Sequence, residues 1–164
     1  MTDSKATVKF DGEEIVAEPI DEEIVAVGTT NVVLAIEGLN NPGTRFYSSI
    51  KSENFADKLA IASALTTSVP IDENLNKEIK LTNFIVQPVE LLNDRTGEVN
   101  TAPRVVMIDA DGTAYHATSI GLLSSLQNIR SVLGEPSDWP APVSIQVVKQ
   151  KGNKGFSFFT IKFL

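Results

Sequence analysis

Apolar and polar residues alternate along most of the second half of the chain, a pattern typical of half-buried β-strands. The alternation predicts strands at residues 77–92, 104–109, 113–117, 142–150 and 156–164. Turn sequences separate them at residues 109–112 (Asp-Ala-Asp-Gly) and 151–155 (Lys-Gly-Asn-Lys-Gly). Residues 93–97 form a loop by composition.

Two stretches instead have helical spacing. The first begins after Ser52 or Asn54 as the N-cap, and its expected core face is Phe55, Leu59, Ala62 and Leu65. The second begins after Thr118 or Ser119 and ends at Gly134, with Pro136 following. Its apolar positions are Leu122, Leu123, Leu126, Ile129 and Leu133.

From residue 77 onward the predicted order is three strands, a helix and two strands, which is the order of an OB-fold barrel. Before it, short strands are expected at residues 6–10, 14–17, 23–27, 32–36 and 45–50. The break at residues 40–43 (Asn-Asn-Pro-Gly) sets a boundary there. We therefore predict a mainly β protein: an OB-like five-stranded barrel with two helices in residues 41–164, and a β-rich N-terminal extension in residues 1–40.

Charge is distributed unevenly between these two parts. The chain has a net charge of −7, and residues 1–40, with nine acidic and two basic side chains, account for all of it. The rest of the chain is balanced, and its last 24 residues hold four lysines and no acid. Local charge decides where a phosphate backbone binds, so the acidic total does not exclude nucleic acid. The alternative for the extension is an acidic surface that keeps the chain soluble.

Catalysis and metal binding find little support in the sequence. There is no cysteine, so disulfides, zinc–thiolate sites and thiol catalysis are excluded. The one histidine, His116, lies in a predicted strand, and no nucleophile elbow or phosphate-binding glycine motif is present. A calcium loop that opens at Asp109 needs Gly at 114 and Glu at 120, where this chain has Ala114 and Ile120. We expect no enzyme activity, no cofactor, no signal peptide and no membrane span.

Binding of a single strand requires bases along the phosphates and flat side chains on which nucleobases stack. The C-terminal hairpin offers both, because Phe156 and Phe158 share a strand face with Lys162 and three more lysines flank them. Alternatively, both faces of that strand are buried. Weaker aromatic–basic groups occur in other strands. Phosphates would meet Arg45, Lys51, Lys80, Arg104, Lys149, Lys151 and Lys154, and nucleobases would stack on Tyr47, Phe84, Tyr115, Phe156 or Phe158.

Three stretches carry a resemblance to a known family: residues 106–119 (VMIDADGTAYHATS), 143–148 (VSIQVV) and 154–161 (KGFSFFTI). They resemble the small single-stranded DNA-binding proteins of tailed bacteriophages, including the Bacillus phages that prime replication with a protein. The similarity extends more loosely back to about residue 45. It implies an OB-like fold, sequence-tolerant binding of single-stranded DNA during phage replication, and no cofactor.

The resemblance also implies a location in the cytoplasm of the bacterial host. Some members carry N-terminal extensions that support self-association. The resemblance therefore leaves open that this chain forms a homo-oligomer and that it has replication proteins as partners. The rival interpretation is a phage structural or assembly protein that does not bind nucleic acid. A weaker rival is an RNA-binding OB module.

Overall fold

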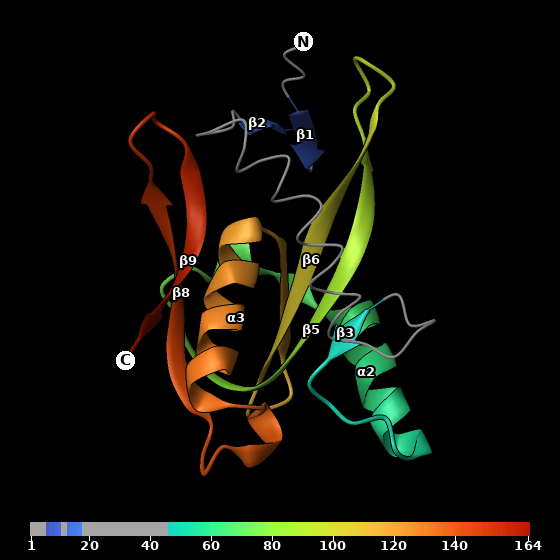
Figure 1. The fold of residues 1–164 in the computed structure, drawn as a ribbon, viewed down its shortest axis with the longest axis vertical. Helices are drawn as coiled ribbons and strands as arrows, with labels where there is room; N and C mark the ends of the chain where they lie inside the picture. The colour runs from blue at the N-terminus through green and yellow to red at the C-terminus, as the bar shows by residue number, and fades with distance from the viewer. Residues whose placement is uncertain (1–5, 11–12, 18–45) are drawn as a thin grey trace.

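The computed structural model describes residues 6–10, 13–17 and 46–164 (Figure 1). Near the N-terminus β1 (Ala6–Phe10) and β2 (Glu13–Ala17) pair antiparallel, which confirms the strands predicted at residues 6–10 and 14–17. The strands predicted at residues 23–27 and 32–36 lie outside the described residues, and so does Arg45.

Seven strands form the main sheet in the part of the chain that follows. They run in the order β4-β7-β6-β5-β8-β9, and β3 pairs with β5 beside this path. The parallel pair is β4–β7, and the other pairs are antiparallel, so the sheet is mixed. The strands are β3 (Tyr47–Ser48), β4 (Val69–Pro70), β5 (Glu78–Leu92), β6 (Val99–Asp109), β7 (Ala114–Thr118), β8 (Val143–Lys151) and β9 (Ser157–Phe163).

This sheet corrects the prediction of a five-stranded barrel. The order of three strands, a helix and two strands is present as β5, β6, β7, α3, β8 and β9. Two short strands, β3 and β4, bring the number to seven, and β4 was not expected. Within the described residues β4 and β9 are the two ends of the path, so the sheet curls into a half-barrel and is not closed.

The long strand β5 organises the curl. Along one side it pairs with β6 from Leu81 to Leu92, and the register shifts between Leu81 and Asn83. Along the other side its first four residues pair with β8, and Ile85 and Val86 pair with β3. A β-bulge bends a strand and increases its twist. The register shift follows Leu81, the last residue of β5 that pairs with β8. The bend at this point therefore turns β5 away from β8.

Helix α3 (Ile120–Leu133) fills the inside of the curl. Ser119 is the N-cap, and its Oγ accepts a hydrogen bond from the backbone N–H of Leu122 at 3.2 Å. The helix ends at Gly134, which has a φ of 79°, a conformation that favours glycine. Its buried side chains are Leu122, Leu123, Leu126 and Ile129, four of the five positions predicted for its apolar face.

Helix α2 (Phe55–Thr67) covers the outer face of the sheet, and of the four residues of its predicted face only Leu65 packs there. The N-cap is Asn54, as expected, but the buried side chains are Ile61 and Ala64. Phe55 is 74% exposed and Leu59 53% exposed. Apolar residues occur all around this helix, so spacing alone did not determine which side would pack. The described residues also form two short 3-10 helices, η1 (Ile71–Asn74) and η2 (Pro136–Asp138).

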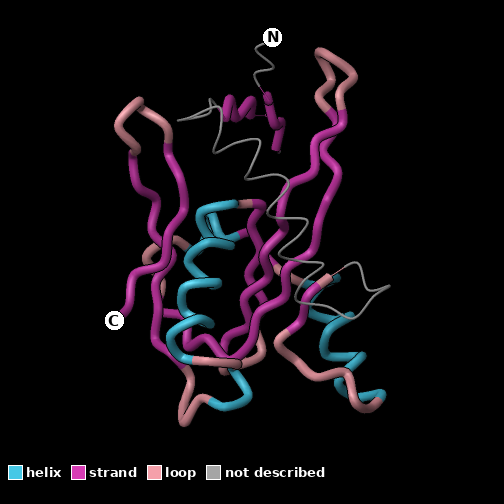
Figure 2. Tube along the Cα trace, viewed as in Figure 1, coloured by secondary structure: helices cyan, strands magenta, loops and turns pink. Residues whose placement is uncertain are grey.

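Two hairpins extend past the core at the same end of the molecule (Figures 1 and 2). We call residues 149–158, at the junction of β8 and β9, the basic arm, because they carry three lysines and no acid. We call residues 90–99, at the junction of β5 and β6, the acidic arm, because they carry three acids and one arginine. The N-terminal hairpin lies beside β5.

Candidate nucleic-acid interface

Three of the aromatic residues proposed to stack nucleobases are buried. Tyr47 is 4% exposed, Phe84 2% and Tyr115 1%, and all three belong to the core inside the curl. A buried ring offers no face to a nucleobase. These three predicted positions therefore require correction: in this structure their rings are core side chains.

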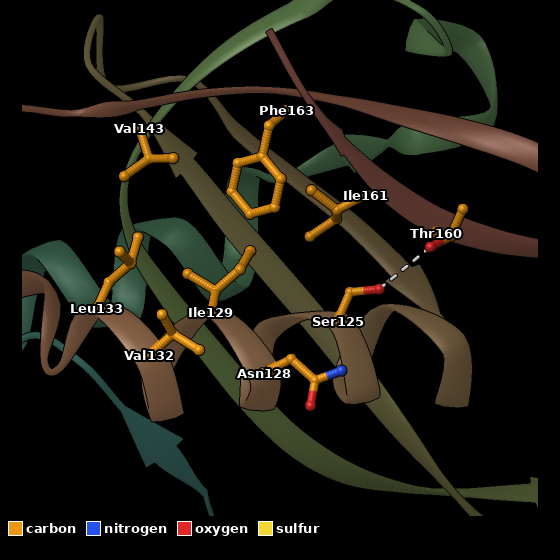
Figure 3. A pocket seen from close by; sticks show the side chains of 9 residues that line it. All are labelled: Ser125, Asn128, Ile129, Val132, Leu133, Val143, Thr160, Ile161 and Phe163. Atoms are coloured by element: carbon orange, nitrogen blue, oxygen red, sulfur yellow. Dashed lines mark hydrogen bonds between the residues drawn. The ribbon is translucent and has the colours of Figure 1, made fainter.

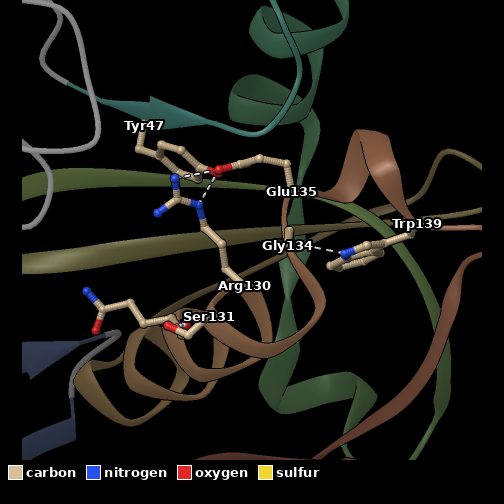
Figure 4. Close-up of polar contacts among 7 residues, drawn as sticks. Tyr47, Arg130, Ser131, Gly134, Glu135 and Trp139 are labelled. Atoms are coloured by element: carbon tan, nitrogen blue, oxygen red, sulfur yellow. Dashed lines mark hydrogen bonds and ion pairs between the residues drawn. The ribbon is translucent and has the colours of Figure 1, made fainter.

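Tyr47 is held by a polar cluster at the end of α3 (Figure 4). Its ring lies 5.4 Å from that of Phe84, its hydroxyl donates a hydrogen bond to Glu135 Oε2 at 2.9 Å, and the Arg130 guanidinium lies 5.3 Å from the ring centroid. Arg130 also forms an ion pair with Glu135. Burial, and then the hydrogen bond to Glu135, raise the pKa of Tyr47 far above its ordinary value. The cluster joins β3 to α3.

Glu135 is the charge at the centre of this cluster, and Lys51 is a further one. Burial alone would raise the pKa of Glu135, but hydrogen bonds from Arg130 and Tyr47 outweigh it and hold that pKa below its ordinary value. The exposed Lys51 lies near enough to lower the pKa of Glu135 as well. Lys51 is thus available at the surface, next to the cluster that fixes Tyr47.

Lys77 binds the hydroxyl of the buried Tyr115. Lys77 Nζ donates a hydrogen bond to that hydroxyl at 2.9 Å and lies 5.4 Å from the ring centroid. The hydrogen bond raises the pKa of Lys77. The ring itself packs in the core, so Lys77 covers the one polar atom that Tyr115 offers.

Arg104 holds the end of α2. Its guanidinium donates hydrogen bonds to the carbonyl oxygen of Leu65 at 3.2 Å and to Ser68 Oγ at 3.0 Å. His116 Nδ1 lies 3.0 Å from the same Ser68 Oγ, and its side chain is half-buried in β7, as the strand pattern predicted. Arg104 was predicted to meet phosphate. The structure uses its donors to anchor α2 to β6.

The remaining predicted residues divide between separate elements. Lys80 is exposed on β5, and its backbone N–H donates to Asp109 Oδ1 at 3.2 Å. The basic arm holds the other five, Lys149, Lys151, Lys154, Phe156 and Phe158. The structure therefore gathers five of the twelve predicted residues on one hairpin. Six more lie elsewhere in the fold, and Arg45 lies outside the described residues.

On the basic arm an aromatic ring and bases are exposed together. Phe158 is 41% exposed, Phe156 is half-buried, and the three lysines are exposed. Lys149 is paired with Phe159 across the two strands, and its Nζ lies 5.8 Å from that ring. Phe159 and Ile161 pack against the core, as predicted, whereas Phe163 on the same face is 55% exposed. Phe158 is paired with Gln150, so the hairpin carries an exposed ring on one face and Lys149 and Lys151 on the other. These are the two kinds of side chain that bind nucleobases and phosphates of a single strand.

Gly121 fixes the position of the arm, and the sequence patterns did not identify it. It lies in the first turn of α3, against the carbonyl oxygen of Phe159, and a Cβ there would also lie 3.6 Å from the Phe158 ring. The sequence offers one signal of this contact, a glycine in the first turn of a predicted helix. Helix propensity alone would favour another residue at that position. This close approach lets α3 cover part of the free edge of β9.

Among the described residues no cluster of histidine, aspartate or glutamate has the composition of a metal site. In the same part of the chain, no helix combines the length and apolar character that crossing a membrane requires.

A family model described as phage single-stranded DNA-binding protein matches residues 42–164. Searches of curated proteins and of solved structures found no match.

Proposed function

We propose, from the premise that this chain belongs to the family of phage single-stranded DNA-binding proteins, that it coats single-stranded DNA with little sequence preference during phage replication. The family is a non-enzymatic DNA-binding family, and we infer the same for this chain. Its place of action is then the interior of the host cell, where the displaced strands are formed. The curled sheet is, in this proposal, an open variant of an OB-like barrel.

The basic arm is the observation that carries the proposal. It combines three exposed lysines, no acid and a partly exposed phenylalanine, Phe158, on one protruding hairpin. Stacking on an aromatic side chain tolerates sequence differences, because every nucleobase has a π-face. Lysine contacts to phosphate carry no sequence information either. The arm therefore suits a protein that must cover any strand.

Outside the basic arm, only some of the predicted basic residues remain candidates for contact with the phosphate backbone. Lys51 and Lys80 remain candidates for phosphate contacts because both are exposed. Arg104 and the buried Tyr47, Phe84 and Tyr115 are left out of the proposed interface. Arg45 stays a prediction from the sequence.

The first test is the binding of fluorescent oligo-dT, followed by anisotropy, for Phe158→Ala and for the control Phe55→Ala. Phe55 is 74% exposed on α2, away from the arm, so its loss removes an exposed ring without touching the proposed interface. One stacked base is worth about 1–3 kcal/mol, so we expect Phe158→Ala to weaken binding by about 5- to 150-fold. The control should bind like the native protein. Equal affinities of both variants would contradict the proposed role of the arm.

Salt dependence tests the lysines. Replacing Lys149, Lys151 and Lys154 by Gln should lower the slope of log affinity against log salt by about 2, since each phosphate contact on a single strand contributes about 0.7. Duplex of equal length and oligo-rU serve as competitors. No binding of the native protein to oligo-dT at low salt would favour a structural or assembly role, and preference for oligo-rU would favour an RNA-binding module.

A further inference from the structure

The acidic arm has the character of a protein-binding surface. At its tip Leu92 and Val99 are paired across the two strands, and each is 58% exposed. Asn93 fixes the turn beside them, because its side-chain oxygen accepts hydrogen bonds from the backbone N–H groups of Arg95 and Thr96 at 3.0 and 3.3 Å. Two aliphatic side chains on an ordered, protruding turn form an apolar knob.

Charge makes this arm a poor contact for DNA. Glu90, Asp94 and Glu98 outnumber Arg95, and the arm has no aromatic residue. Carboxylates beside a phosphate backbone repel it, and aliphatic side chains offer no stacking face. Although it rises from the same end of the molecule as the basic arm, the acidic arm calls for a different partner (Figure 1).

An apolar groove lies between α3 and β9 (Figure 3). Its volume is about 490 Å³, which falls within the range of binding sites for small ligands and clusters of side chains. Val132 on its rim is 82% exposed and Phe163 is 55% exposed. Its lining also includes Ile129, Leu133 and Ile161.

The groove begins where helix and strand separate. The first turn of α3 contacts β9 at Gly121, and Ser125 Oγ lies 3.4 Å from Thr160 Oγ1. Beyond this point the last turns of α3 and the end of β9 line the two walls. Since β9 is an end strand of the sheet in the part of the chain that the structure describes, no described strand pairs with its outer edge along this stretch. An apolar surface next to an unpaired strand edge is a common site of protein association.

The charges around the groove are opposite to those of the acidic arm. The three elements that form it carry no acidic side chain, and on β9 the exposed Lys162 lies between the lining residues Ile161 and Phe163. The first acid after α3, Glu135, is paired with Arg130. An apolar knob with acidic neighbours therefore has a counterpart on the same chain, an apolar groove with Lys162 beside it and no acid on the elements that form it.

We propose that the acidic arm of one protomer docks in the α3–β9 groove of a second copy of this chain. Leu92 and Val99 would enter the groove beside Val132 and Phe163, with the carboxylates of the arm facing Lys162 of β9. The tip of the acidic arm and the C-terminal end of β9 lie far apart in Figure 1, so one protomer has both surfaces available at once.

Such a contact joins two different surfaces and repeats from copy to copy. A repeated heterologous contact builds an open chain unless the rotation closes it into a ring. An open chain of protomers is the arrangement needed along a single strand, and in this respect the inference rests on the proposed function. The basic arm of each protomer stays free for DNA, because neither partner surface includes Phe158.

Disulfide trapping tests the contact directly, since the native chain has no cysteine. The variants are Val99→Cys on the knob, Val132→Cys on the groove, and the double variant. Both side chains are largely exposed, so neither change should unfold the protein. A disulfide forms only when the two Cα atoms come within about 7 Å. We expect the oxidised double variant on long oligo-dT to give a ladder of multimers, and the mixture of single variants to give dimers only.

The control mixture pairs Val99→Cys with Ser63→Cys, an exposed position on α2. The proposal is overturned if this control, or Val99→Cys alone, cross-links as well as the knob–groove mixture. It is also overturned if no cross-link forms while anisotropy shows the DNA to be bound. The double variant is oxidised without DNA at high protein concentration too, so that a failure to bind oligo-dT leaves the contact testable by itself.

A second readout avoids cysteine. Leu92→Ser with Val99→Ser should lower affinity for long oligo-dT by about tenfold, the effect of a lost contact of 1.4 kcal/mol. Affinity for a strand that holds one protomer should not change. Equal losses on both strands would mean that the arm acts within its own protomer, contrary to the proposal.

Discussion

Gly121→Ala is expected to destabilise the protein, although alanine is the better helix former. The backbone of α3 meets the carbonyl oxygen of Phe159 at this position, and an added Cβ would lie far inside normal contact distance of that oxygen. The obstacle is backbone on an element held by β8, not the flexible end of a side chain. Helix and strand must therefore move apart.

The magnitude follows from two opposing effects. Overpacking of this kind costs about 1–3 kcal/mol. Replacing glycine by alanine in a helix interior returns at most about 1 kcal/mol, and less in the first turn. The expected net loss is about 1–2 kcal/mol, which for a chain of this size lowers the unfolding midpoint by about 2–8 °C.

Thermal unfolding followed by circular dichroism measures this change, with Gly152→Ala as the control. At Gly152 a Cβ would lie 3.7 Å from the nearest atom, the carbonyl oxygen of Phe156, which is an ordinary contact. The control midpoint should stay close to that of the native protein. If Gly121→Ala leaves the midpoint unchanged or raises it, the close approach of α3 to β9 is refuted.

Two further changes test the polar contacts. Glu135→Gln should lower stability at pH 7, and the gap to the native protein should close as the pH falls towards 3 in denaturant titrations. The folded-state pKa of Glu135 is lower than its pKa in the unfolded chain, which is about 4.3, so the ionised carboxylate stabilises the fold at pH values above about 4.3. That stability is lost as the pH falls and the carboxylate is protonated. A stability gap that does not change with pH would contradict this prediction. Arg104→Met should cost about 1–2 kcal/mol by removing the donors to Leu65 and Ser68, while oligo-dT affinity stays unchanged; a weakened affinity in a folded variant would return Arg104 to the interface.

The order of the strands was predictable because the sequence alternates along whole strands. Residues 77–92 and 142–150 show this alternation, and β5 and β8 match them closely. Helix α3 was predictable for the same reason, since its apolar residues lie on one face and Ser119 and Gly134 mark its ends. Strand β4 was not, because a two-residue strand has no periodicity to detect.

The interface was less predictable because aromatic residues serve two purposes. Tyr47, Phe84 and Phe158 all lie in or beside strands with bases nearby, and that pattern does not distinguish a core ring from an exposed one. The distinction depends on what covers each strand face. A hydrogen bond from Tyr47 to Glu135, 88 residues away in sequence, leaves no local trace.

The position of α2 explains why DNA is proposed to follow the arm. OB-fold proteins commonly bind oligonucleotides on the face of their second and third strands and with two flanking loops. In the same order these strands are β6 and β7, but Ile61 and Ala64 of α2 pack against Val106 and Ala114 on their outer face. Arg104 secures the end of that helix. With this face covered, the two hairpins that flank it remain as candidate contacts for DNA. Of these, only the basic arm has the charge to hold a phosphate backbone. The acidic arm is then left for the proposed contact with a neighbouring protomer.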